Sequence, residues 1–167
     1  MCHHKAPHRS WEPHPSTRKL YNNPIKIPET FTDDYRHRAK AAKVAKMRVA
    51  EDLTYFDLGL SQPEGGAREV GELVEGSLDR KVPFPETEAE VREMKLFDST
   101  TGENYVFEGR EALREFKYQR YMQRYLRCVH SVDESVGDLL DYLDDEGLAE
   151  DTVVMYTSDQ GKLPSPS

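Results

Sequence analysis

The second half of the chain carries apolar residues at every third or fourth position. These positions are Tyr118, Met122, Tyr125, Val129, Val132, Val136, Leu139 and Leu143. Because this spacing follows one face of an α-helix, the pattern predicts a single long amphipathic helix over residues 110–146. Gly147 comes next, and glycine commonly supplies the left-handed residue that ends a helix.

A short run of β-branched and aromatic residues follows, in the sequence "DTVVMYTSDQG". It predicts a buried strand over residues 152–158, with Asp159 and Gln160 at its carboxyl end. A helix, a glycine turn and a buried strand make half of an α/β unit, so the predicted fold class is α/β. One strand cannot form a sheet, and we therefore expect its partner strands to lie outside this sequence.

The first half of the chain divides into three predicted regions. Prolines are too closely spaced in residues 1–31 for regular structure, so this region is predicted to be loop. Residues 32–58 begin with acids and continue with alanine, lysine and methionine, which predicts a helix. Residues 59–109 are read as a variable surface insertion, in which "MKLFDSTTGENYVFEG" indicates a small hairpin. With residues 162–167 as a disordered polar tail, we expect one partial domain over residues 1–167.

The charge of the chain limits its partners. Its formal net charge is −8, and its isoelectric point is near 5.3. This charge argues against nucleic acid as a partner, because phosphate binding requires a basic face. The sequence also has no apolar run long enough to span a bilayer. Two cysteines are too few for a disulfide framework, and Cys128 is predicted to be a small buried apolar residue.

The sequence "HHKAPHR", residues 3–9, is the first candidate for chemistry. Lys5 and Arg9 can neutralise an oxyanion, and His8 can give a proton to a departing oxygen. Two alternatives stay open on spacing alone. The segment can be a solvated histidine-rich tract, or His3, His4 and His8 with Cys2 can form a zinc site.

The second candidate is Asp159 with Gln160, near Asp151 and Ser158. Carboxylate and amide oxygens are ligands that calcium prefers, although an aspartate that only caps a turn would look the same. The acidic run near the end of the long helix is interpreted as a solvated face. The aromatic and basic stretch "EFKYQRYMQRYLR" is interpreted as core packing and not as a nucleic-acid surface.

Taken in order, three stretches give the chain a family resemblance: "HHKAPHRSWEP", "IPETFTDDY" and "KYQRYMQRYLRCVHSVDESVGDLLDYLDDEGLAEDTVVMYTSDQG". Together they resemble the formylglycine-dependent sulfatases of the alkaline-phosphatase-like superfamily. The first and third stretches are similar to those of sulfatases that act on sulfated carbohydrates, including glucosamine-type sugars. The resemblance implies a partial alkaline-phosphatase-like fold and an exported parent protein, in the periplasm, the extracellular space or the lysosome.

The resemblance also implies roles for individual residues. His8 matches the histidine that contacts the sulfate near the leaving oxygen, and Lys5 and Arg9 are implied substrate contacts, with Trp11 on the substrate side of the loop. Asp159 and Gln160 match a pair that binds Ca²⁺. The implied substrate is a sulfated carbohydrate or an aryl sulfate, hydrolysed through a formylglycine nucleophile.

Two departures limit what this chain is expected to do alone. No "CxPSR" motif, whose cysteine becomes formylglycine, is present. The tail "KLPSPS" stands where the family continues through "GEHG". We therefore expect a fragment truncated at both ends and inactive by itself. The alternatives are a fragment of a related phosphatase or phosphodiesterase, and a noncatalytic helical interaction module.

Overall fold

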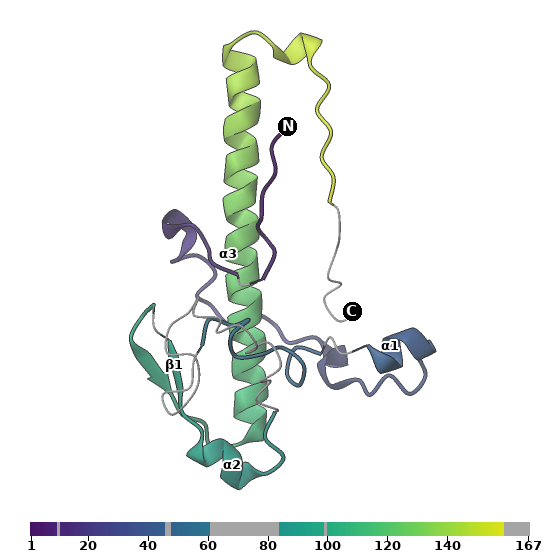
Figure 1. Ribbon diagram of the computed structural model, residues 1–167, viewed down its shortest axis with the longest axis vertical. Coiled ribbons are helices and arrows are strands. Elements are labelled where there is room, and N and C mark those ends of the chain that lie inside the picture. The colour runs from purple at the N-terminus through teal and green to yellow at the C-terminus, as the bar shows by residue number, and fades with distance from the viewer. Residues whose placement is uncertain (10, 46–47, 61–83, 99, 159–167) are drawn as a thin grey trace, which may run out of the picture.

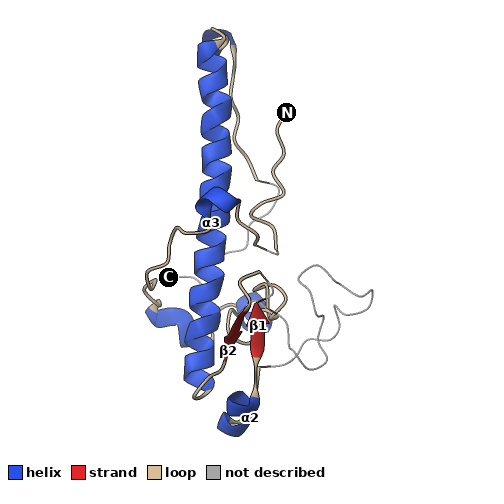
Figure 2. Ribbon diagram, turned by 90° about the vertical axis from the view of Figure 1, so that its left-hand side faces the viewer, coloured by secondary structure: helices blue, strands red, loops and turns tan. Residues whose placement is uncertain are grey.

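A computed structural model describes residues 1–167 except 10, 46–47, 61–83, 99 and 159–167. Its described regular elements are short except for one helix, as Figures 1 and 2 show. They are the 3₁₀ turns η1 (Pro15–Thr17), η2 (Glu29–Thr32) and η4 (Ala149–Asp151), the helices α1 (Lys40–Val44), α2 (Glu88–Glu93) and α3 (Arg110–Asp145), and the strands β1 (Leu96–Asp98) and β2 (Glu103–Tyr105). The described fold is therefore mixed helical with a small two-stranded sheet.

Helix α3 is the axis of the molecule, and it agrees closely with the predicted helix. It has 36 residues, so it is about 54 Å long at 1.5 Å per residue. At its first turn, the backbone N–H of Arg110 donates to a carboxylate oxygen of Glu88, 2.8 Å away. At its end, Gly147 has a φ of 66° and the Leu148 N–H donates to the Leu143 carbonyl. The periodic pattern and the glycine stop are both confirmed.

The hydrophobic core surrounds the first half of α3. Leu113 and Leu58 are fully buried there, and Tyr121 and Cys128 are each 2% exposed. Cys128 is thus the small buried residue that the sequence predicted. Beyond this core, the second half of α3 projects away from the body, and Leu139 on its apolar stripe is 44% exposed. Within the described ranges, no helix is both long and apolar enough to cross a membrane.

The predicted hairpin is present beside the first half of α3 (Figure 2). β1 and β2 pair antiparallel, with Leu96 opposite Tyr105 and Asp98 opposite Glu103. Gly102 takes a φ of 76° in the turn, and its N–H donates to the Asp98 carbonyl over 2.7 Å. The region predicted as a surface insertion also contributes to the core, because Val91, Leu96 and Phe107 are buried.

The predicted buried strand over residues 152–158 is wrong as a description of this structure. Residues 152–158 run extended without strand pairing, and Val153, Met155 and Tyr156 are 80% exposed or more. A strand needs a neighbour to satisfy its backbone groups and cover its side chains. β1 and β2 pair only with each other, so this apolar run has no described sheet to join, and a buried central strand is not part of the described fold.

The predicted helix over residues 32–58 is reduced to α1. Asp33 and Asp34, expected to begin it, instead accept hydrogen bonds from the backbone N–H groups of Tyr35 and Arg36. Such side-chain contacts compete with a helix start, and Tyr35 turns the chain further with a φ of 57°. The apolar residues after α1 then pack as loop, with Val49, Leu53 and Leu58 among those buried in the core.

Candidate functional site

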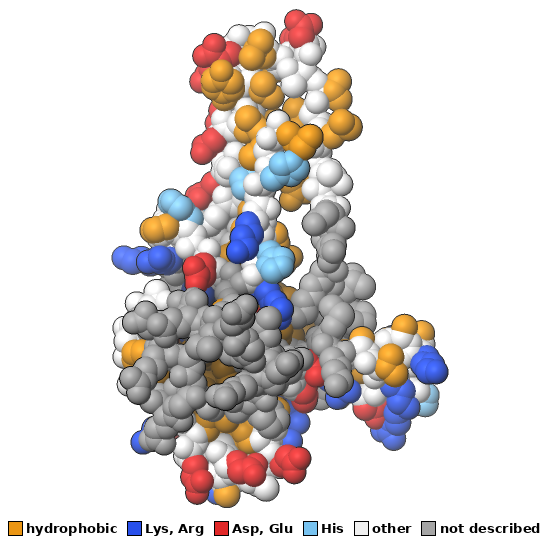
Figure 3. Space-filling view, viewed as in Figure 1, with side chains coloured by type: hydrophobic (Ala, Val, Ile, Leu, Met, Phe, Trp, Pro, Cys, Tyr) orange, Lys and Arg blue, Asp and Glu red, His pale blue; other side chains and the backbone are white. Residues whose placement is uncertain are grey.

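The candidate residues near the amino terminus lie together in one exposed turn. The N–H of His8 donates to the Lys5 carbonyl over 2.9 Å, and Lys5, His8 and Arg9 are all exposed. The Nδ1 of His8 lies 2.5 Å from the Arg9 carbonyl oxygen, and a hydrogen bond between these atoms requires the tautomer with its proton on Nδ1. Nε2 is then the nitrogen through which this ring can exchange a proton with a ligand. Figure 3 shows histidine and basic side chains along the amino-terminal segment on this face.

Trp11 anchors this turn to the core. Its side chain is 4% exposed, and its ring packs edge-on against Tyr121 of α3 with 4.7 Å between centroids. Its indole N–H donates to the Pro7 carbonyl over 2.8 Å. A buried aromatic pair with this geometry stabilises the fold beyond the contribution of its buried area, so the contact holds the loop on α3. The structure therefore gives Trp11 an anchoring position, and its place on the substrate side of the loop stays a prediction.

Arg9 is held by a second contact, to a carboxylate 48 residues away. Its Nη1 lies 3.4 Å from Oδ1 of Asp57, and the two side chains are 56% and 4% exposed respectively. The Thr54 N–H donates to the other oxygen of Asp57 over 3.0 Å, and the Asp57 N–H donates to the Thr54 hydroxyl. The position of the Asp57 carboxylate is thus fixed by hydrogen bonds within its own turn, independently of Arg9.

The turn that carries Asp57 rests on a buried lysine of α3. Lys117 is 2% exposed, and its Nζ donates to the carbonyls of Ala50 and Leu53, the latter at 2.8 Å. Its ammonium also lies 5.1 Å from the centre of the Tyr55 ring. Burial lowers the pKa of Lys117 to about 8, although the charges of Glu51, Asp52 and Asp57 oppose this. Lys117 is thereby a cross-link between α3 and the loop at residues 50–58.

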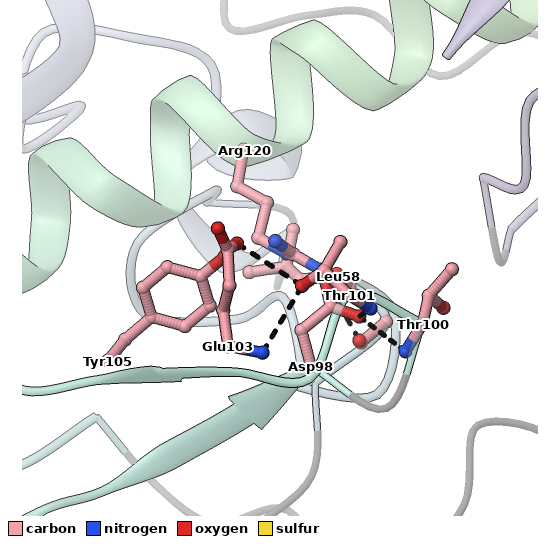
Figure 4. Close-up of polar contacts among 8 residues, drawn as sticks. Leu58, Asp98, Thr100, Thr101, Glu103, Tyr105 and Arg120 are labelled. Atoms are coloured by element: carbon pink, nitrogen blue, oxygen red, sulfur yellow. Dashed lines mark hydrogen bonds and ion pairs between the residues drawn. The ribbon is translucent and has the colours of Figure 1, made fainter. Parts of the chain in front are cut away.

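A second cation of α3 ties the same loop to the hairpin (Figure 4). Arg120 contacts a carboxylate oxygen of Asp98 at 2.6 Å and donates from Nε to the Leu58 carbonyl at 2.6 Å. Burial by itself would raise the pKa of Asp98, but the hydrogen bond and charge of Arg120, with the N–H groups of Thr100 and Thr101, hold it below its ordinary value. The two side chains are 3% and 12% exposed, so this is a buried ion pair.

Sequence reasoning assigned the stretch containing these cations to core packing, but it considered only the aromatic residues. Lys117, Arg120, Arg124 and Arg127 recur at spacings of three and four, which is a signal for one helix face. Asp57 carried no signal, because nothing local marks it as a partner of Arg9.

The second candidate lies outside the described residues, since Asp159 and Gln160 are not among them. Asp151, in η4, and Ser158 are exposed. The structure therefore brings Lys5, His8 and Arg9 together, and the predicted calcium ligands stay a prediction. In the described part of the chain, no group of three or more His, Cys, Asp or Glu side chains is placed so that it could hold a metal ion. The zinc alternative gains no support, because Cys2 contacts only His4, at 3.5 Å, among the predicted ligands.

Comparison with known proteins gives the family. The sequence profile of the Sulfatase family matches residues 12–166, so it begins just after the exposed turn. The N-acetylglucosamine-6-O-sulfatase of Bacteroides thetaiotaomicron is 36% identical over 170 aligned positions, which cover 96% of this chain and 29% of that protein. This chain thus spans less than a third of the length of that relative, and no solved structure gave a significant match. Because the profile covers most of the sequence, the chain belongs to the sulfatase family.

Proposed function

We propose that this chain is the portion of a carbohydrate sulfatase that binds the sulfate group of its substrate. The observation that carries the proposal is the exposed turn with Lys5, His8 and Arg9, anchored by Trp11 and tied to Asp57. A sulfated carbohydrate is favoured because the relative that matches 96% of the chain is named for action on N-acetylglucosamine 6-sulfate groups.

The chemistry follows from the side chains of that turn. The charges of Lys5 and Arg9 stabilise the negative oxygens of a sulfate ester, and the guanidinium can donate two parallel hydrogen bonds to them. When a sulfate ester breaks, the departing alcohol oxygen gains negative charge. His8 can lower the cost of that step by giving it a proton from Nε2.

Asp159 and Gln160 are proposed as calcium ligands on the chemistry of their oxygens. Calcium takes six to eight oxygen ligands, so a complete shell needs more groups than this pair. Such a metal would stabilise charge on the sulfate oxygens. The "CxPSR" motif of the nucleophile does not occur in this sequence. We therefore propose that the chain binds sulfated sugar but does not hydrolyse it unaided.

The test separates binding from turnover. Titration of N-acetylglucosamine 6-sulfate into the purified chain, followed by NMR, should perturb the amide signals of the turn. Unsulfated N-acetylglucosamine should perturb them far less. Lys5→Ala and His8→Ala should weaken binding, whereas Lys43→Ala, which removes an exposed lysine of α1, should leave it unchanged.

Two results would overturn this proposal. Robust hydrolysis of aryl or sugar sulfates by the purified chain with added calcium would refute its dependence on a missing nucleophile. Equal or tighter binding of N-acetylglucosamine 6-phosphate would instead favour the related phosphatases.

A further inference from the structure

Asp57 is a buried carboxylate whose position is fixed independently of the amino-terminal turn. It is 3% exposed, and a buried charge of this kind is rarely found without partners. One of its oxygens accepts from the Thr54 N–H, and its own N–H donates to the Thr54 hydroxyl. This leaves Oδ1 pointing to the contact with Arg9 at 3.4 Å.

The turn that carries Asp57 is bound to α3 on both sides. Lys117 donates to the Leu53 carbonyl just before the Thr54–Asp57 turn, and Arg120 donates to the Leu58 carbonyl just after it. The Leu58 N–H also donates to the Tyr55 carbonyl at 3.0 Å, which closes the turn internally. Because both flanks of the turn are bound to α3, the Asp57 carboxylate cannot move without breaking buried contacts.

Arg9 is the exposed partner of this pair. Its side chain is 56% exposed, and its described contact to Asp57 uses Nη1. A long exposed arginine normally samples many rotamers, and ordering it on binding costs affinity. A single contact to a fixed carboxylate removes part of that cost while exposure leaves the guanidinium accessible to an anion.

We propose that Asp57 is a positioning residue for substrate binding, which holds Arg9 in the orientation that receives the sulfate group. This inference rests on the proposed function of the turn. Asp57 does not touch the substrate and acts through Arg9 alone. The contact thereby joins a site near the amino terminus to the core around Lys117.

Electrostatics makes the test sharp, because the two possible effects of Asp57 have opposite signs. A carboxylate near an anion site repels the anion, so Asp57→Asn would tighten binding if charge alone mattered. Positioning predicts the reverse. We expect Asp57→Asn to weaken the binding of N-acetylglucosamine 6-sulfate by about 2- to 10-fold, the cost of ordering one long side chain.

Three measurements complete the experiment. Asp57→Asn should not weaken binding further in an Arg9→Ala background, because the positioning effect acts through Arg9. The heteronuclear NOE of the Arg9 Nε–H group should fall in Asp57→Asn without ligand. Glu51→Gln, which removes a half-exposed carboxylate paired with Arg114, is the matched control and should not weaken binding.

A variant on the exposed partner covers the possibility that Asp57→Asn does not fold. Arg9→Lys keeps the positive charge but loses the guanidinium geometry, and it should also weaken binding. If the wild-type chain binds the sulfated sugar, either of two results would overturn this inference alone. One is an affinity that is unchanged or tighter in those of the Asp57→Asn and Arg9→Lys variants that fold. The other is an Arg9 NOE that does not change in Asp57→Asn. Absence of binding by the wild-type chain would overturn the proposed function, and this inference with it.

Discussion

The buried pair of Asp98 and Arg120 allows a quantitative prediction about stability. Asp98→Ala leaves the Arg120 guanidinium, 12% exposed, without its carboxylate and removes an acceptor for the Thr100 N–H. Removing one partner of a buried ion pair leaves an uncompensated charge in a poorly solvated place, which costs about 3–5 kcal/mol. The free energy of unfolding should fall by that amount at pH 7.

The assay is urea unfolding, with the fluorescence of Trp11 as a probe because it is the single tryptophan and is buried. Far-ultraviolet circular dichroism of α3 gives a second probe. The control is Arg38→Ala, which breaks the surface pair with Asp33, where the side chains are 47% and 27% exposed. Exposed pairs contribute about 0–1 kcal/mol, so this variant should remain close to wild type.

Acid gives an independent check on the same pair. The folded pKa of Asp98 is lower than its unfolded value, so the stabilisation is present above about pH 4 and is lost as the pH falls through the folded pKa. The gap between wild type and Asp98→Ala should therefore narrow in acid. A cost similar to that of Arg38→Ala, or a gap that does not change with pH, would refute the assignment of a buried ion pair.

Three further predictions concern other parts of the fold. The pKa of Lys117 is about 8 in the folded chain and about 10.4 in the unfolded chain. Between pH 8 and 10 the unfolded state therefore binds more protons than the folded state, so the free energy of unfolding should rise with pH in this range. Lys117→Met should abolish that rise in urea melts. Gly59→Ala should lower the free energy of unfolding by about 1–3 kcal/mol, because Gly59 has a φ of 66° and an added Cβ would lie 2.7 Å from Arg124 Nη2. A urea melt equal to that of wild type would contradict this left-handed conformation at Gly59. Val153→Ser with Met155→Ser should change unfolding free energy by less than about 0.5 kcal/mol, since both are exposed; a larger loss would indicate burial.

The elements that the sequence predicted well depend on local signals. Helix α3 was predictable because its period and its glycine stop are both contained in neighbouring residues. The hairpin was predictable because its turn carries Gly102 between two strand-like runs. Both patterns would be the same whatever the rest of the protein did.

The failed predictions depend on what lies elsewhere in space. The run at residues 152–158 has strand-forming residues, yet strand formation requires a neighbouring backbone that the described fold does not offer it. Residues 32–58 have helix-forming composition, but Asp33 and Asp34 bind the nearest backbone N–H groups instead. The cluster Lys5, His8 and Arg9 was visible as a motif, whereas its support by Asp57 required knowledge of which distant turn packs beside it.

Helix α3 occupies two environments, and this divides one continuous element into two thermodynamic units. From Arg110 to about Val132 its side chains are held by the core and by the amino-terminal segment, where the Thr17 and Ser131 hydroxyls meet at 2.9 Å. Beyond Glu134, many of its side chains are exposed, including Leu139, Leu140 and Tyr142. Backbone amides in the first part can exchange with solvent deuterium only when the body opens, whereas those in the second part can exchange by fraying of the helix end. A single unbroken helix would therefore show a gradient of protection along its length that its uniform geometry does not reveal.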